Sequence, residues 1–244
     1  MRNLKVLMAY KGTAYHGFQR QDNAITVQEV VEKCVSKVLN HNVVINGCSR
    51  TDTGVHANNY CFSVLTDSII PPRNFIRGVN GHLPADISIL NCEEAEPEFH
   101  ARFSCIGKEY EYRIHNSESK NPFETDLSYH YRRPFDADLV RYAAEKFIGT
   151  HNFASFCSNY NEKQDTVRTI YDFSVEINGD SVKMLVKGNG FLYNMIRIMV
   201  GTLLAVNEGN IKADDLESIM KAKNRQLAGR TAAAHGLYLN RIFY

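Results

Sequence analysis

Alternating apolar and polar positions divide the first half of the chain into a short series of strand-like and helix-like segments. Residues 3–10 alternate as in a strand with one buried face. Residues 27–39 repeat apolar side chains at i, i+3, i+4 and i+7, which is typical of a helix, and Thr26 with Glu29 forms a capping box before it. The remaining segments are strand-like residues 43–46 and 60–65, a short helix around 73–82 and a strand at 87–92.

The same order of elements recurs after a glutamate-rich junction at residues 93–102. Asp136 is predicted to cap a helix whose stripe is Leu139, Tyr142, Ala143, Lys146 and Phe147. Asn178-Gly179 is typical of a type I′ hairpin turn. The other predicted elements are a strand at 104–115, hairpin strands at 168–177 and 181–187, helices at 193–206 and 214–222, and a closing strand at 237–244.

The order β-α-β-β-α-β, found twice, predicts an α+β protein of two tandem ferredoxin-like domains. We expect the domains to comprise residues 1–103 and 104–244. Their antiparallel sheets can join into a larger one, with an active-site cleft between the domains, where ligand sites are common.

The composition is that of an ordinary globular protein. With 44% hydrophobic and 23% charged residues, the 244-residue chain can bury a substantial core. Lys and Arg number 28 against 27 Asp and Glu, and this net charge of +1 excludes a strongly basic nucleic-acid binder but permits a local basic cleft. The apolar run at 6–10 is too short for a signal peptide, and no segment approaches a transmembrane length. We therefore expect a cytoplasmic protein without a membrane partner.

The sequence predicts no metal site and no cofactor. The six cysteines form no Cys-x-x-Cys pair and have no His-x-x-x-His nearby, so we interpret them as reduced thiols. No Gly-x-Gly-x-x-Gly, phosphate-loop lysine or His-Glu-x-x-His motif is present.

Asp52 is the candidate for chemistry in the first half. It lies in a loop bracketed by Gly47 and Gly54, two residues after Arg50. Glycine permits positive φ or the close approach of a ligand, and a nearby guanidinium favours the ionised carboxylate that a nucleophile or base requires. Asp-Thr-Gly alone is also ordinary turn chemistry, so both interpretations stay open at this point.

Arg197 is the candidate in the second half, because residues 195–206 are apolar nearly all round. Taken alone, an arginine in such a helix is expected to snorkel to a rim. A loop carboxylate that needs a cation reverses the balance, because each group would relieve the desolvation of the other. We therefore predict a contact between Asp52 and Arg197 that spans the two domains.

Residues 47–57 as a whole resemble the Gly-x-x-Arg-Thr-Asp-x-Gly-Val-His signature of the bacterial tRNA pseudouridine synthase A family. Residues 189–197 are similar to its Asn-x-Phe-x-x-x-Met-x-Arg segment, and residues 108–112 to its strand with a stacking tyrosine. Further matches lie at 10–21, 99–104, 167–170 and 236–239, and departures from the family pattern at Phe18, Cys48, Ser49, Thr53 and His82.

The resemblance implies a role for several residues. Asp52 would be the nucleophile, with Arg197 beside it, and Arg50 would stabilise the everted nucleotide. Tyr110 would stack on the target base, and Leu237 would help close the pocket. Further substrate contacts are implied for Gln19, Arg20, Arg102, Arg168 and the pair Arg132 and Arg133.

Three neighbouring residues are predicted to be structural. A strand tyrosine is usually half-buried packing, and we assign that role to Tyr112. A single histidine without a triad or ligand spacing is weak evidence for catalysis, so His56 and His100 are expected to fix loops by hydrogen bonds.

As a member of this family the protein would be an isomerase that converts uridine to pseudouridine at nucleotides 38–40 of the tRNA anticodon stem-loop. The C1′–N1 bond breaks, the uracil turns and C1′ joins C5, which needs neither metal nor redox cofactor. The base must leave its stack to be reached. Attack by Asp52 at C1′ or at C6 stays open, and the family acts as a homodimer.

Two other classes of protein are weighed against this one. A hydrolase with a carboxylate nucleophile would need a metal-binding Asp-x-Asp or a second carboxylate, and Asp67, the next aspartate after Asp52, is a whole strand away. A non-catalytic RNA-binding module would not require the pairing of Asp52 with Arg197.

Overall fold

The computed structural model describes residues 1–161 and 165–244, which pack into two compact units. Unit 1 comprises Met1–Ile106 together with Tyr238–Tyr244, and unit 2 comprises Gly107–Leu237. The sequence-based division at 103/104 placed the whole C-terminal strand in the second domain. In the structure this strand, from Tyr238 on, belongs to unit 1.

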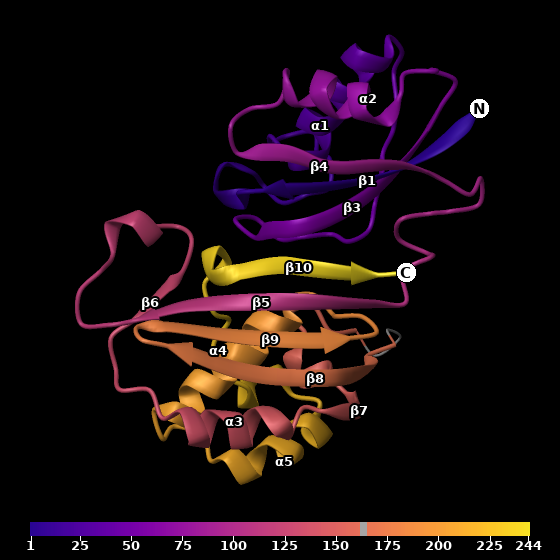
Figure 1. The fold of residues 1–244 in the computed structure, drawn as a ribbon. Helices are drawn as coiled ribbons and strands as arrows, with labels where there is room; N and C mark the ends of the chain where they lie inside the picture. The colour runs from indigo at the N-terminus through magenta and orange to yellow at the C-terminus, as the bar shows by residue number, and fades with distance from the viewer. Residues whose placement is uncertain (162–164) are drawn as a thin grey trace. The chain divides into compact units, whose positions relative to one another are not determined.

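Unit 1 is a ferredoxin-like sheet with two helices, as predicted. Its sheet has the order β4-β1-β3-β2, all antiparallel, with Val6 of β1 opposite both Phe62 of β3 and Cys92 of β4. The elements are β1 (Arg2–Tyr10), α1 (Val27–Leu39), β2 (Asn46–Gly47), β3 (His56–Thr66), α2 (Pro72–Asn80) and β4 (Ile87–Ala95). α2 packs against α1 and β4, and these elements lie together in Figure 1.

The C-terminal strand β10 (Leu237–Phe243) extends this sheet beside the N-terminal end of β3. It runs parallel to β3, with Tyr238 opposite His56 and Leu239 opposite Ala57. The two Asn side chains that follow His56 hold it further, because Asn58 Nδ2 donates to Asn240 Oδ1 and Asn59 Nδ2 to the Asn240 carbonyl, both at 3.0 Å.

The predicted strand at 43–46 is wrong over most of its length, since β2 contains only Asn46 and Gly47. The cause is visible in the hydrogen bonds. The N–H of Val43 donates to Ser36 Oγ and that of Ile45 to Glu32 Oε1, both at 3.1 Å. Because α1 side chains occupy these N–H groups, the segment does not join the sheet at those positions.

Unit 2 is built on the antiparallel order β5-β9-β8-β7, with the short β6 parallel to β5. The elements are β5 (Gly107–Asn116), β6 (Tyr129–Tyr131), α3 (Ala137–Glu145), β7 (Gly149–Asn152), β8 (Val167–Asn178), β9 (Ser181–Gly188), α4 (Met195–Asn207) and α5 (Leu216–Ala222). α3 packs against α4 and β8. The α+β class is confirmed, and β6 and β7 are additions that the sequence did not predict.

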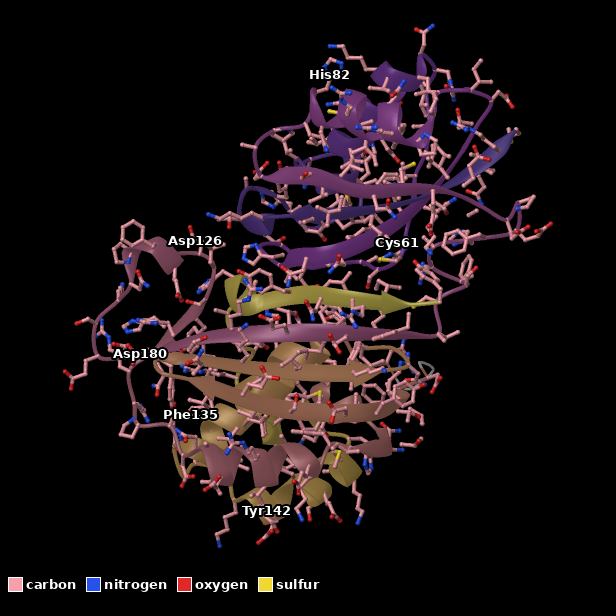
Figure 2. All side chains as sticks on the ribbon, viewed as in Figure 1. Cys61, His82, Asp126, Phe135, Tyr142 and Asp180 are labelled. Carbon is pink, nitrogen blue, oxygen red and sulfur yellow. The ribbon has the colours of Figure 1, made fainter. Side chains whose placement is uncertain are left out.

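The hairpin of β8 and β9 is confirmed, but its turn is not type I′. The two-residue loop is Gly179-Asp180, and Figure 2 shows Asp180 at its tip. Gly179 has φ +57°, whereas Asp180 is not among the residues with positive φ. A type I′ turn requires positive φ at both central residues.

The caps of the helices follow the sequence, but the buried face of α3 does so only in part. Asp136 accepts the N–H of Leu139 at 3.0 Å, as predicted for an N-cap. Of the predicted stripe, Ala143 and Phe147 are buried, whereas Leu139 and Tyr142 are exposed, and α3 buries Val140 and Ala144 as well. Figure 2 shows Tyr142 on the outside of α3.

The six cysteines are free thiols. Burial raises the pKa of Cys61, which is labelled on β3 in Figure 2, and that of Cys92 to about 11 each, so both are protonated at neutral pH. Within residues 1–161 and 165–244, no helix has the length and apolar character needed to cross a membrane.

Candidate active site

The loop that carries Asp52 is closed by its own backbone. It runs from Cys48 to Val55, between β2 and β3, and the N–H of Val55 donates to the Asp52 carbonyl at 3.1 Å. Gly54 within this turn has φ +78°, which confirms the predicted need for glycine there. Asp52 itself is half-buried.

The hydroxyl groups of two tyrosines, Tyr10 and Tyr60, hold the Asp52 loop by hydrogen bonds. The hydroxyl of Tyr60 donates to the Ser49 carbonyl and accepts the Ser49 N–H at 3.4 Å. The hydroxyl of Tyr10 lies 2.8 Å from Thr51 Oγ1. Both tyrosines are buried strand residues of unit 1. Their hydroxyl groups therefore tie Ser49 and Thr51, which precede Asp52, to the sheet of unit 1.

The segment 12–18 also holds the loop, through backbone hydrogen bonds. The N–H of Phe18 donates to the Thr51 carbonyl at 3.2 Å, and that of Gly54 to the Tyr15 carbonyl at 3.4 Å. Gly17 has φ +81°, and a Cβ there would lie 2.5 Å from the Thr51 carbonyl oxygen. No other residue type fits this close approach without displacing the loop.

Phe18 and Tyr60 also stack on each other, with ring centroids 4.3 Å apart and an interplanar angle of 25°. A Cβ on Gly47 would overlap both side chains. Gly47 therefore leaves room for this aromatic pair.

Both histidines fix loops, as predicted. His56 Nδ1 accepts the N–H of Gly12 at 2.9 Å, and His56 is 1% exposed. His100 Nδ1 accepts the N–H of Arg102 at 3.1 Å and that of Phe103 at 3.4 Å. In each ring the Nδ1 atom is engaged as an acceptor for backbone N–H groups, which fits a structural role.

Three predicted site residues, Gln19, Arg50 and Arg102, line one open pocket of unit 1, with a volume of about 210 Å³. Arg50 and Arg102 are exposed. The pocket also takes in Ser49, so it borders the Asp52 loop directly. Gln19, Arg50 and Arg102 come from different parts of the sequence, and the fold of unit 1 brings them together.

Arg20 lies beside this pocket and is held by Glu32 of α1, with 3.4 Å between Arg20 Nη1 and Glu32 Oε2. Glu32 is only 5% exposed and also accepts from Gln28 Nε2 at 2.9 Å. Since its carboxylate is satisfied by several donors, Glu32 fixes the position of Arg20 relative to α1.

Arg197 lies in the first turn of α4 in unit 2 and is half-buried. Its Nε donates to the Ala232 carbonyl at 2.8 Å and its Nη1 to Asn194 Oδ1 at 2.9 Å. The Arg197 carbonyl in turn accepts the Ala232 N–H at 3.0 Å. These bonds fix the orientation of the guanidinium plane, and the predicted contact with Asp52 stays a prediction.

Tyr110 is 6% exposed and lies on β5 opposite Val186 of β9. Its ring meets that of Phe191 edge to face, with centroids 5.3 Å apart. Arg168, at the start of β8, is half-buried, and its Nη1 donates to the Val167 carbonyl at 2.6 Å. The role of Tyr110 in stacking on a base stays a prediction.

Tyr112 is a fully buried core residue, as predicted, and burial raises its pKa. Its hydroxyl donates to the Ala233 carbonyl at 2.8 Å. Ala233 follows Ala232, whose carbonyl accepts the hydrogen bond from Arg197 Nε. Leu237 follows at the start of β10 and is 5% exposed. Burial is the main cause that lowers the pKa of His235 in the same segment.

Several supporting residues were not identified from the sequence. Glu32 lies in the middle of α1 but off its predicted apolar stripe, and a glutamate there predicts a solvated face. Asn194 has φ +61° immediately before α4, a conformation in which asparagine is enriched, so its position was a signal that could have been used. Phe18 offered no such signal, because its partner Tyr60 is distant in sequence.

The match to known proteins covers most of the chain. Residues 6–104 and 143–244 match the family model described as tRNA pseudouridine synthase. The chain is 42% identical to the tRNA pseudouridine synthase A of Acetivibrio thermocellus over 244 residues, and 44% identical to that of Ruminiclostridium cellulolyticum over 245, with 100% of each chain covered in both. It is 41% identical to that of Bacillus pumilus over 243 residues, covering 99% of this chain and 98% of the relative. On this agreement in sequence, the chain belongs to the tRNA pseudouridine synthase family.

Proposed function

We propose that this protein, an isomerase that acts on tRNA, forms pseudouridine at nucleotides 38–40 of the anticodon stem-loop, with Asp52 as the nucleophile. The observation that carries the proposal is the support of the Asp52 loop. Backbone and tyrosine hydroxyl bonds fix it on both sides, and it borders a pocket with two exposed arginines. A preorganised carboxylate beside a cationic surface suits attack within a polyanionic substrate.

The uridine must leave the helical stack before Asp52 can reach C1′ or C6. Arg50 is exposed and lies two residues from Asp52 in the same loop. We assign Arg50 the task of stabilising the everted nucleotide, because its guanidinium can occupy the vacated space and contact phosphates.

Arg197 would orient the Asp52 carboxylate and keep it ionised during the reaction. Its guanidinium is suited to such a role, because Ala232 and Asn194 already fix its plane. Tyr110 would stack on the uracil and Leu237 would close the pocket over it. Asp52 would bond to C1′ or C6. After the C1′–N1 bond breaks, the uracil turns, C5 joins C1′, the bond to Asp52 breaks, the C5 proton is lost and N1 takes up a proton, so that the reaction is a net isomerisation.

Recognition of the RNA would rest mainly on shape and phosphates. Gln19 and Arg102 lie in the pocket next to Arg50, and Arg20 is fixed beside it by Glu32. In unit 2, Arg168 and the exposed pair Arg132 and Arg133 add positive charge. Together these groups would explain how a chain of net charge +1 binds a nucleic acid.

The direct test is incubation of the protein with unmodified tRNA transcripts, followed by mapping of pseudouridine. We expect pseudouridine at 38–40 and no free uracil, because the base is retained. Transcripts with cytidine at each of these positions serve as matched substrates. Release of uracil would identify a hydrolase, and tight binding without any product would identify a non-catalytic RNA-binding module.

We further propose that the enzyme acts as a homodimer, by resemblance to the family and because a tRNA is large relative to one chain. Light scattering at micromolar concentration measures the mass directly. A dimer of a 27.7 kDa chain supports the proposal, and a monomer contradicts it.

A further inference from the structure

Phe103 is an aromatic side chain exposed to solvent at the edge of the unit 1 pocket. It is 77% exposed and lines the same pocket as Arg50 and Arg102. The His100 ring lies against it, with centroids 4.4 Å apart and an interplanar angle of 37°. The Arg102 guanidinium lies 5.7 Å from the centre of the Phe103 ring. An exposed ring among cationic side chains is the arrangement that stacks nucleobases.

The loop that presents Phe103 is held in place. His100 Nδ1 accepts the N–H groups of Arg102 and Phe103, and the His100 N–H donates to Ser104 Oγ at 3.1 Å. The preceding Ala101 is tied to the sheet of unit 1, since its N–H donates to Ser63 Oγ and its carbonyl accepts from Tyr244 Oη at 2.8 Å. The ring is therefore positioned before any ligand arrives, which lowers the entropic cost of binding.

The chemistry of the pocket favours a nucleotide. None of the residues that line it is acidic, and besides its two arginines it contains the amides of Gln19 and Asn46. Guanidinium groups bind phosphates, and amides can hydrogen-bond the edges of a base. Its volume of about 210 Å³ is below the ~300–1,000 Å³ of pockets for drug-sized ligands, which fits one base rather than a longer segment.

The pocket borders the loop of the proposed nucleophile, so a nucleotide bound in it would lie close in the strand to one bound at Asp52. Ser49 and Arg50 belong both to its wall and to the Asp52 loop. Two residues of chain span at most about 7 Å, and successive nucleotides of a stacked strand rise about 3.4 Å.

We propose that Phe103 is the stacking platform for an unpaired base next to the target uridine, with Arg102 binding the phosphate of that nucleotide. This proposal rests on the proposed function and extends it to a second base of the substrate. Stacking on Phe103 would stabilise the everted conformation of the target uridine, because the neighbouring base could then no longer stack on the uracil inside the helix.

Fluorescence of 2-aminopurine tests the stacking, because this base analogue is quenched when it stacks on an aromatic ring. It is placed singly at the nucleotides on either side of the target uridine in an isolated anticodon stem-loop RNA. The RNA is bound to the Asp52→Asn variant to prevent turnover. We expect quenching at one flanking position, lost in Phe103→Leu and kept in Phe103→Trp. Equal quenching by Phe103→Leu overturns the proposal.

Kinetics on the wild-type background give an independent readout. Phe103→Ala should raise KM by about 5- to 150-fold, the loss expected for one stacked base, with a smaller change in kcat. Arg102→Ala should reduce the slope of log K against log salt by about 0.7, the value for one phosphate of a single strand. Phe123→Ala is the matched control, because Phe123 is 89% exposed in unit 2.

The outcomes separate this proposal from the proposed function. If the wild type forms pseudouridine and Phe103→Ala has the KM of Phe123→Ala, the stacking platform is wrong and the enzyme assignment stands. If the wild type forms no pseudouridine on any transcript, the proposed function fails first. A raised KM confined to Phe103→Ala and Phe103→Leu supports the platform.

Discussion

The two candidate elements of the reaction, the Asp52 loop of unit 1 and the Arg197 turn of unit 2, are held in place in different ways. Backbone groups fix the Asp52 loop: Thr51 receives the N–H of Phe18, Gly54 donates to Tyr15, and Asp52 receives the N–H of Val55. Arg197 is fixed through its own side chain, by the Ala232 carbonyl and Asn194 Oδ1.

This difference determines which substitutions each element tolerates. A loop fixed through its backbone depends on neighbouring glycines and on the chain path, so changes at residues that never meet the substrate should disturb it. An arginine fixed by two hydrogen bonds depends on its own donors, so even lysine should fail to replace it. The variants below test these two expectations, from the largest expected effect to the smallest.

Arg197→Met should lower kcat/KM by at least about 100-fold, the loss expected when one charged group that stabilises the reacting site is removed. Arg197→Lys keeps the charge but cannot keep both the Ala232 and the Asn194 bond, so we expect it to recover only part of the activity. Single-turnover assays measure both. A lysine variant as active as the wild type would show that charge alone matters in unit 2.

The same change tests the predicted pairing with Asp52. Met suits the apolar α4, so in urea denaturation Arg197→Met combined with Asp52→Asn should be less destabilised than the sum of the single variants. Additive changes in the free energy of unfolding, together with near-normal turnover of Arg197→Met, would mean that Arg197 snorkels to solvent.

Gly17→Ala should lower turnover by about 10- to 100-fold although residue 17 is not proposed to touch the reacting base. The added Cβ would lie 2.5 Å from the Thr51 carbonyl, so the loop must move, and positive φ costs a further ~1–2 kcal/mol. Gly179→Ala is the matched control, with φ +57° and no atom within 4 Å of the added Cβ. It should lose stability and retain full activity. Equal activity of the two variants would contradict backbone positioning of the loop.

Tyr60→Phe and Tyr112→Phe each remove one buried hydroxyl, the first from unit 1 and the second from unit 2, so their activities can be compared directly. Each residue is fully buried, and each variant leaves a backbone carbonyl without its donor, at about 1–3 kcal/mol. Tyr60 holds Ser49 of the Asp52 loop directly, so we expect about tenfold lower turnover. Tyr112 holds Ala233, whereas Arg197 keeps its own bond to Ala232, so turnover should change less. Similar losses of activity in both would remove the distinction.

Asn194→Gly gives the smallest expected effect, a decrease of about two- to fivefold in kcat. Glycine keeps φ +61° at the start of α4 but removes the acceptor for Arg197 Nη1, while the bond from Nε to Ala232 remains. Steady-state kinetics measure the change. A loss as large as that of Arg197→Met would show that Asn194, rather than Ala232, determines the orientation of the guanidinium.

Elements with a strong local signal were predictable from the sequence. The stripe of α1, the caps at Thr26 and Asp136 and the hairpin of β8 and β9 depend on residues within a few positions of one another. The requirement for Gly54 was predictable for the same reason, because a turn sets the φ of its own residues.

What could not be predicted depends on contacts between distant residues. In the strand expected at 43–46, backbone N–H groups are bound by side chains of α1 instead of by a neighbouring strand. The C-terminal strand pairs with β3, which is distant from it in the sequence. The buried face of α3 was assigned only in part, because the exposed Leu139 and Tyr142 give a stronger apolar signal than the buried Ala144. At the candidate site, the pairs Phe18 with Tyr60 and Arg197 with Ala232 have no local signature.

The central claim is that Asp52 carries the chemistry, and single-turnover kinetics of Asp52→Asn test it most directly. Asparagine is nearly isosteric, so the turn closed by Val55 should persist, and Asp180→Asn at the exposed hairpin tip is the matched control. We expect Asp52→Asn to bind tRNA with affinity close to wild type and to form no measurable pseudouridine, while Asp180→Asn retains full activity. Turnover of Asp52→Asn within about tenfold of wild type, only ~1.4 kcal/mol of barrier, would contradict the account.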